Sequence, residues 1–148
     1  MEIVETYLKK KDNAILNVKP INDATTGATI FRDMFGDNSQ ECLGIICLDV
    51  KNVPTHFSII YKGTTNCIVI SPKDILKVAI LSNATSIIMG HNHPSSDLTP
   101  SEQDILTTRN IAKACESVGL KLLDHLIVNA IGDHYSIREH HNKEFGEN

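Results

Sequence analysis

Hydrophobic residues follow two different periods along the chain, and together they predict a mixed order of helices and strands. Residues 1–20 are predicted to form a polar leader with one candidate strand, from Ala14 to Val18. Helical spacing of apolar residues covers 22–35, 72–83 and 100–118. Short apolar or alternating runs, typical of strands, cover 41–50, 56–61, 66–70, 85–90, 120–128 and 134–137. This order favours an α/β (α+β) fold with a mixed central β-sheet flanked by helices, and residues 21–148 are expected to form a single domain.

Local signals set the ends of several elements. The segment Lys51–Pro54 is predicted to join two antiparallel strands as a hairpin connection. Gly36 and Gly119 are placed to end the first and last helices. The middle helix is predicted to start with Ser71 as N-cap and Pro72 just inside it. Its apolar face is expected to bury Ile75, Leu76, Ala79 and Ile80.

Composition narrows the class of protein. Hydrophobic residues make up 41% of the chain and charged residues 22%, which is ordinary for a globular domain. No run reaches the roughly 18 apolar residues of a membrane span, and the first residues do not resemble a signal peptide, so a cytoplasmic protein without membrane contact is expected. The net charge of -4 predicts weak or no direct binding of nucleic acid. The four cysteines lack Cys-x-x-Cys spacing, which favours buried free thiols.

The segment 90–104 carries the most specific chemistry. His91 and His93 directly follow the strand predicted over 85–90, and alternate residues of a strand point to the same face. Further on, Thr99 is the expected N-cap of the last helix, Pro100 its first residue and Glu102 the partner in a capping box. A strand end and a helix start are therefore predicted to face each other.

The helix start would contribute Ser101 and Asp104 to one side of its first turn. Two histidines and Asp104 can then close around one zinc ion and leave a fourth position open, which is the arrangement of a catalytic zinc. Water bound to such an ion has a pKa near 7, and a general base is still needed to move protons. Taken singly, a loop histidine is usually a surface residue, and an aspartate in a first turn is favoured by the helix dipole. Their conjunction favours a metal site.

The sequence His91-Asn-His-Pro-Ser-Ser-Asp-Leu-Thr-Pro-Ser-Glu-Gln-Asp104 resembles the metal-binding signature of the JAMM (JAB/MPN+) metalloprotease superfamily, most closely its RadC-like family. The superfamily pattern also has a glutamate on an early strand, written Glu-x-x-Gly, which Glu41-Cys-Leu-Gly44 matches. The runs 122–128 and 135–139 are similar to RadC-like proteins as well. Ser96 departs from the glycine more common in that family. The segment before residue 40 is also too short for the helix-hairpin-helix module of its full-length members.

The resemblance implies a JAB/MPN-like (cytidine-deaminase-like) domain that hydrolyses amide or isopeptide bonds. It implies His91, His93 and Asp104 as ligands of one Zn²⁺ per chain. By the same resemblance, Glu41 is the general acid and base, and Ser101 donates a hydrogen bond to the oxyanion. The expected substrate is a peptide or a protein conjugate, and a homodimer is the candidate assembly.

Two rival hypotheses remain at this stage. One is a RadC-like accessory protein in DNA repair or mobile-element biology without protease activity, and the other is a metal-stabilised scaffold without turnover. A further alternative concerns Asp124 and His125, which strand alternation places on opposite faces. One of them could orient a zinc ligand, or the two could form a structural hydrogen-bonded pair.

Overall fold

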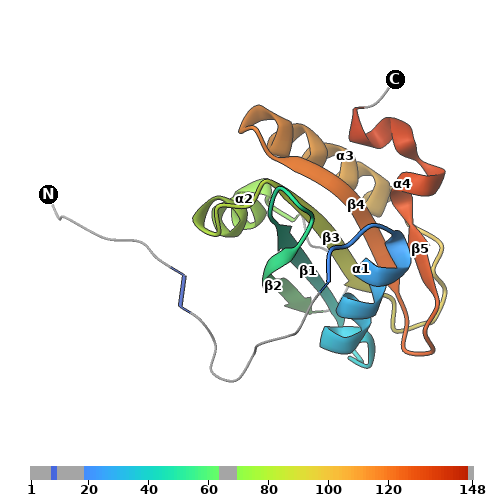
Figure 1. Cartoon of the computed structure of the whole chain (residues 1–148). Helices are drawn as coiled ribbons and strands as arrows, with labels where there is room; N and C mark the ends of the chain where they lie inside the picture. The colour runs from blue at the N-terminus through green and yellow to red at the C-terminus, as the bar shows by residue number, and fades with distance from the viewer. Residues whose placement is uncertain (1–7, 10–18, 64–69, 147–148) are drawn as a thin grey trace, which may run out of the picture.

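The protein is described here by a computed structural model that covers residues 8–9, 19–63 and 70–146 (Figure 1). The strand predicted from Ala14 to Val18 lies outside the described residues, as do Cys67 and most of the run predicted over 66–70. The described strands form a five-stranded sheet in the order β2-β1-β3-β4-β5. Their bounds are β1 Glu41–Leu48, β2 Pro54–Gly63, β3 Ser86–Asn92, β4 Lys121–Val128 and β5 His134–Ser136.

The sheet is mixed, as the sequence predicted. Strands β1 and β2 are antiparallel and joined by a short connection, so the predicted hairpin is confirmed. On its other side β1 runs antiparallel to β3, which pairs in parallel with β4. Strand β5 adds an antiparallel edge. A parallel pair needs a long crossover, and a helix provides it between β3 and β4.

Helices cover both faces of the sheet. They are α1 Ala24–Phe31, which continues into the π-helical turn η1 Arg32–Gly36, then α2 Pro72–Leu81, α3 Glu102–Ser117, α4 Ile137–His140 and the 3₁₀ turn η2 Asn142–Phe145. Figure 1 shows α1 in front of the strands and α3 behind β4. None of the helices in the described part of the chain is long and apolar enough to cross a membrane.

The alternation of β1 divides the buried side chains into two cores. Leu43, Ile45 and Cys47 pack with residues of α2 and α3, including Ile75 and Ile111. Their neighbours Cys42, Ile46 and Leu48 pack with α1 and η1 on the opposite face. Glu41 stands two residues before Leu43 at the start of the same strand. Strand alternation therefore assigns it to the face covered by α2 and α3.

Two glycines allow aromatic rings to lie directly on the α1 face of the sheet. Gly44 and Gly90 are partners in the β1–β3 register. A Cβ at Gly90 would lie 2.6 Å from the Phe31 ring, and one at Gly44 would lie 3.0 Å from the Phe35 ring. Both phenylalanines are buried, and their ring centroids are 5.6 Å apart. His91 follows Gly90 in β3, so the phenylalanine rings pack against the back of the strand that carries this predicted metal ligand.

Two details of the predicted helices change. Ile80, expected inside, is 53% exposed, and Val78 packs against the core in its place. The α-helical part of the first helix ends at Phe31, although the π-helical turn that follows does reach the predicted stop at Gly36. The described cysteines, Cys42, Cys47 and Cys115, are buried free thiols, as predicted.

Candidate metal centre

The end of β3 brings two histidines to one point. His91 is the penultimate residue of the strand and His93 directly follows it, so the two rings lie on the same face, as alternation predicted. Their Nε2 atoms are 2.9 Å apart. His91 is 1% exposed and the His93 side chain 16% exposed. The inner ring is therefore fixed by packing, whereas the outer one borders the solvent.

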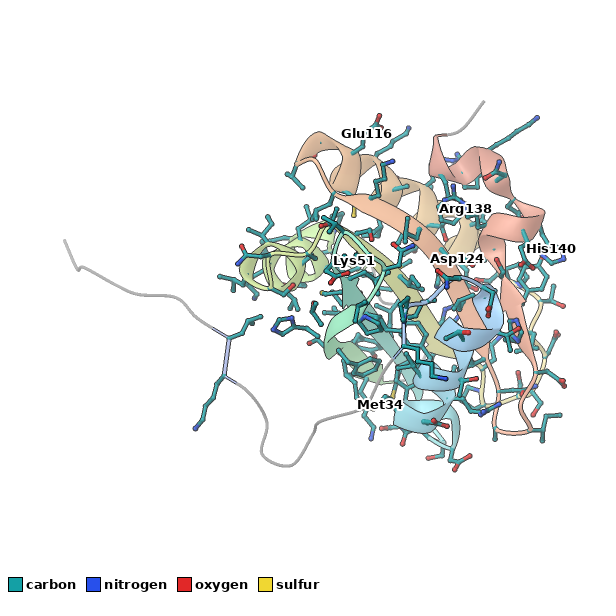
Figure 2. The ribbon with its side chains drawn as sticks, viewed as in Figure 1. Met34, Lys51, Glu116, Asp124, Arg138 and His140 are labelled. Carbon is teal, nitrogen blue, oxygen red and sulfur yellow. The ribbon has the colours of Figure 1, made fainter. Side chains whose placement is uncertain are left out.

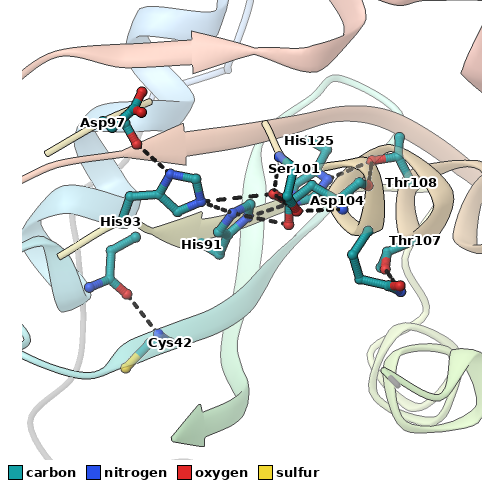
Figure 3. A network of polar contacts seen from close by, with 11 residues as sticks. Cys42, His91, His93, Asp97, Ser101, Asp104, Thr107, Thr108 and His125 are labelled. Atoms are coloured by element: carbon teal, nitrogen blue, oxygen red, sulfur yellow. Dashed lines mark hydrogen bonds and ion pairs between the residues drawn. The ribbon is translucent and has the colours of Figure 1, made fainter. Parts of the chain in front are cut away.

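The first turn of α3 adds a carboxylate to the histidines. Asp104 Oδ1 lies 3.4 Å from His91 Nε2, and Oδ2 lies 3.9 Å from His93 Nε2. Figure 3 shows the three side chains converging between the end of β3 and the start of α3. The predicted meeting of strand end and helix start is thus found in the structure.

The helix begins two residues later than predicted. Ser101, not Thr99, is the N-cap, so Pro100 lies outside the helix and Glu102 is its first residue. The capping box pairs Ser101 with Asp104: Ser101 Oγ accepts from Asp104 N at 3.1 Å, and Asp104 Oδ2 accepts from Ser101 N at 2.8 Å. Both residues fit the capping-box pattern, because Thr99 has a glutamate three residues later and Ser101 an aspartate. The capping box therefore orients the candidate ligand itself.

Glu41 joins the same group from the neighbouring strand. Ligand atoms of Glu41, His91, His93 and Asp104 all lie within 4.8 Å of one another. Among the described residues, Glu41 Oε2 is the buried side-chain oxygen or nitrogen without a hydrogen-bond partner. Burial raises the pKa of Glu41, and the negative charge of Asp104 adds to this while His93 opposes it. A carboxylate with a raised pKa and an uncommitted oxygen is suited to exchanging protons.

Asn92, between the two histidines, points to the other face of the sheet and fixes the residues on both sides of Glu41. Its Oδ1 accepts from Cys42 N at 2.7 Å, and its Nδ2 donates to the carbonyls of Asn38 and Gln40 at 3.1 and 3.2 Å. Asn92 is fully buried, so these bonds are shielded from water. This role was not predicted from the sequence. The alternation of the His-x-His motif, which sends its middle residue away from the histidines, was the available signal.

A side chain from β4 contacts the ring nitrogen of His91 that is directed away from His93 and Asp104. His125 Nε2 lies 2.8 Å from His91 Nδ1, and His125 Nδ1 lies 2.6 Å from Thr108 Oγ1 on α3. Ile87 pairs with Leu122 and Ile88 with Asp124, so Leu123 is an extra residue in β4. Without this bulge, alternation from Leu122 would turn His125 away from the site. Thr108 was missed because no motif marks it.

Asp124 serves the opposite side of β4, as alternation predicted. Its carboxylate accepts from Ser136 Oγ at 2.7 Å and from Arg138 N at 3.1 Å. Figure 2 shows Asp124 and Arg138 close together near the start of α4. Of the two residues whose roles were left open, His125 contacts a candidate ligand and Asp124 holds β5 and α4.

The four candidate residues line a cavity of about 350 Å³. Leu43, Tyr61, Ile70, Ser101 and Gln103 also line it. The Ser101 hydroxyl lies in the cavity wall and donates to Asp104 Oδ2 at 2.6 Å. The two imidazoles and the Asp104 carboxylate form a donor set that fits a divalent metal such as zinc, and Glu41, with one carboxylate oxygen unpartnered, lies beside it.

The fold and this group of side chains define a JAB-type domain with a candidate metal site. The chain belongs to the RadC-like JAB domain family, whose model matches residues 21–142.

Relatives in two bacterial genera support the assignment. The chain is 45% identical to a UPF0758 protein of Streptococcus sanguinis over 137 residues, which cover 93% of this chain and 60% of that protein. It is 39% identical to a UPF0758 protein of Staphylococcus epidermidis over 101 residues, or 68% of this chain and 45% of that protein. The chain thus spans at most 60% of the length of these relatives.

Proposed function

We propose that this domain binds one zinc ion and hydrolyses amide or isopeptide bonds in peptides or protein conjugates. The observation that carries this proposal is the position of Glu41. Its unpartnered, buried Oε2 belongs to a carboxylate within 4.8 Å of the ligand atoms of His91, His93 and Asp104. Structural zinc sites are usually closed by four Cys or His ligands, whereas three ligands with a free carboxylate beside them match a catalytic site.

The division of roles follows from chemistry. A zinc ion held by His91, His93 and Asp104 supplies a Lewis acid for a carbonyl oxygen and makes a water molecule acidic enough to ionise near neutral pH. Glu41 accepts the proton of the attacking water and returns it to the leaving nitrogen, for which its unpartnered Oε2 suits it.

Ser101 and the apolar wall of the cavity complete the proposed site. The Ser101 hydroxyl donates to Asp104 in the cavity lining, which supports the proposal that it turns toward a developing oxyanion. Leu43, Tyr61 and Ile70 favour an apolar group of the substrate next to the bond that is cleaved.

The metal assignment is tested by zinc content after purification without chelator. Wild type should carry about one zinc per chain, and His91→Ala and Asp104→Ala should lose it, because a site with three protein ligands loses most of its affinity with any one of them. His56→Ala is the matched control, since His56 is exposed on β2 and outside the ligand group. Undiminished zinc in both ligand variants would contradict the assignment.

The hydrolase assignment is tested with Glu41→Gln, which keeps the shape of the side chain but cannot accept a proton. A set of peptides with ordinary and lysine-linked isopeptide bonds, followed by mass spectrometry, provides the assay. Glu41→Gln should keep its zinc and lose at least about a hundredfold in cleavage rate. Glu102→Gln, the same change at an exposed position of α3, should cleave as wild type does. No cleavage by zinc-loaded wild type would instead favour a scaffold, and equal cleavage by Glu41→Gln would remove Glu41 from the mechanism.

A further inference from the structure

The hydrogen bonds behind His91 form a chain in which the position of each proton can be deduced. The chain starts at the backbone carbonyl of Asp104, which can only accept. Thr108 Oγ1 lies 2.7 Å from that oxygen and donates its single proton to it. The same hydroxyl lies 2.6 Å from His125 Nδ1. With its proton already used, the hydroxyl oxygen can only accept, so Nδ1 of His125 carries a proton.

The protonation of His125 determines which nitrogen of His91 carries a proton. His125 is fully buried, and its ring nitrogens contact a hydroxyl and an imidazole but no carboxylate, so nothing there would compensate a buried charge and the ring is neutral with its proton on Nδ1. Its Nε2 is then an acceptor, and His91 Nδ1, 2.8 Å away, must donate to it. A neutral His91 that is protonated on Nδ1 presents an unprotonated Nε2 to the site.

A different hydrogen bond holds His93 as the same Nδ1-protonated tautomer. Its Nδ1 lies 2.5 Å from the backbone carbonyl of Asp97, which can only accept, so Nδ1 of this ring is the protonated nitrogen. The Nε2 atoms of His91 and His93 therefore face each other at 2.9 Å, each with a lone pair and without a proton between them. Two lone pairs at this distance repel, and a cation that accepts both removes the repulsion.

We propose that Thr108 and His125 are positioning residues that hold His91 as the Nδ1-protonated tautomer and so keep its Nε2 directed at the metal site. This inference rests on the proposed metal centre. The chain of hydrogen bonds also closes on itself, because it begins at the backbone of Asp104, whose carboxylate oxygen lies 3.4 Å from His91 Nε2. It links a ligand on β3 to a ligand on α3 through one helical turn, since Asp104 and Thr108 are four residues apart.

Zinc affinity of Thr108 variants tests the proposal without requiring a substrate. Thr108→Val keeps the shape of the side chain but removes the hydroxyl, and zinc affinity, measured by competition with a chelator, should fall about 10- to 100-fold, as is usual for a lost partner of a ligating histidine. Thr108→Ser restores the hydroxyl and should bind close to wild type. Thr107→Val makes the same change one residue away, outside the chain of hydrogen bonds, and should also bind close to wild type. Thr108→Val with wild-type affinity, or equal losses in Thr108→Ser and Thr108→Val, would overturn the proposal.

Nitrogen NMR of the imidazole rings provides a second test in the unmutated protein. In the metal-free wild type, His91 and His125 should both show protonated Nδ1 and unprotonated Nε2, and Thr108→Val should mix the tautomers of His125. A wild-type His91 protonated on Nε2 would overturn the proposal even if no variant folds. If wild type shows the expected tautomers but binds no zinc, the proposed function fails while the chain of hydrogen bonds stands, so the two failures are distinguishable.

Discussion

Replacing Asn92 should uncouple the strand that carries the histidines from the segment that carries Glu41. In Asn92→Ala three hydrogen bonds disappear, those with the amide of Cys42 and with the carbonyls of Asn38 and Gln40. The Cys42 amide then lacks its buried partner, which costs about 1–3 kcal/mol. Truncation also leaves a small cavity. We expect the free energy of unfolding to fall by about 2–4 kcal/mol, within the range for loss of a buried polar network.

The assay is urea unfolding of the metal-free protein, combined with hydrogen exchange of the Cys42 amide. Exchange of that amide should accelerate in Asn92→Ala by more than the change in global stability explains. Asn38→Ala is the control, because it removes an asparagine side chain from the same segment, where that side chain makes a weak hydrogen bond to Cys42 Sγ at 3.2 Å. Asn38 is half-buried, so the loss of this one hydrogen bond should cost about 0.5–1.5 kcal/mol, less than Asn92→Ala.

Asn92→Asp provides a sharper test of the same reasoning. It keeps an acceptor for the Cys42 amide but directs a second carboxylate oxygen at two carbonyl oxygens. The variant should be at least as unstable as Asn92→Ala at neutral pH and should recover partly in acid, where a protonated carboxyl can donate. The reasoning is refuted if Asn92→Ala unfolds at the wild-type urea concentration with unchanged exchange of Cys42.

Three further predictions concern the core, a buried thiol and nucleic acid. Gly90→Ala places a Cβ 2.6 Å from the Phe31 ring and should cost about 1–3 kcal/mol in urea unfolding; adding Phe31→Leu should recover part of this, and strictly additive losses would argue against the contact. Burial raises the pKa of Cys115 to about 11, so its contribution to stability is full below the unfolded value near 8.5 and is lost as the pH rises toward 11. Between these limits wild type should lose roughly 3 kcal/mol relative to Cys115→Ala, and parallel stability profiles would contradict this. From the net charge of -4, duplex DNA should bind weakly and without sequence preference in fluorescence anisotropy at near-physiological salt; sub-micromolar, sequence-dependent binding would be the opposite result.

The sequence was informative wherever a short-range pattern determines geometry. The alternation of His91 and His93 and the spacing to Asp104 were enough to predict that these side chains meet, because strand and helix periods are regular. The mixed sheet followed from the order of the periodic segments in the same way. The chemical roles of Glu41 and Ser101 remain predictions that only activity can test.

The remaining features depended on choices between near-equal local patterns or on contacts across the fold. Thr99 and Ser101 both satisfy a capping box, and the preference for Ser101 became visible only in the structure. The face on which His125 lies depends on one extra residue in β4, and a bulge cannot be located from hydrophobic alternation alone. Thr108 matters through a partner 17 residues away, which no local pattern encodes.

The paired glycines of β1 and β3 show that the Glu-x-x-Gly pattern joins two unrelated requirements. Its glutamate lies in the candidate metal centre on one side of the sheet, while Gly44, with Gly90 opposite, leaves room for phenylalanine rings on the other. Only the thickness of the β3 backbone separates the Phe31 ring from the face on which His91 lies. A relative that kept every ligand and the glutamate but carried a larger residue at either glycine would therefore be judged intact by an inspection of ligands alone. Its sheet could not pack against the same phenylalanine rings unless the strands that carry the ligands shifted.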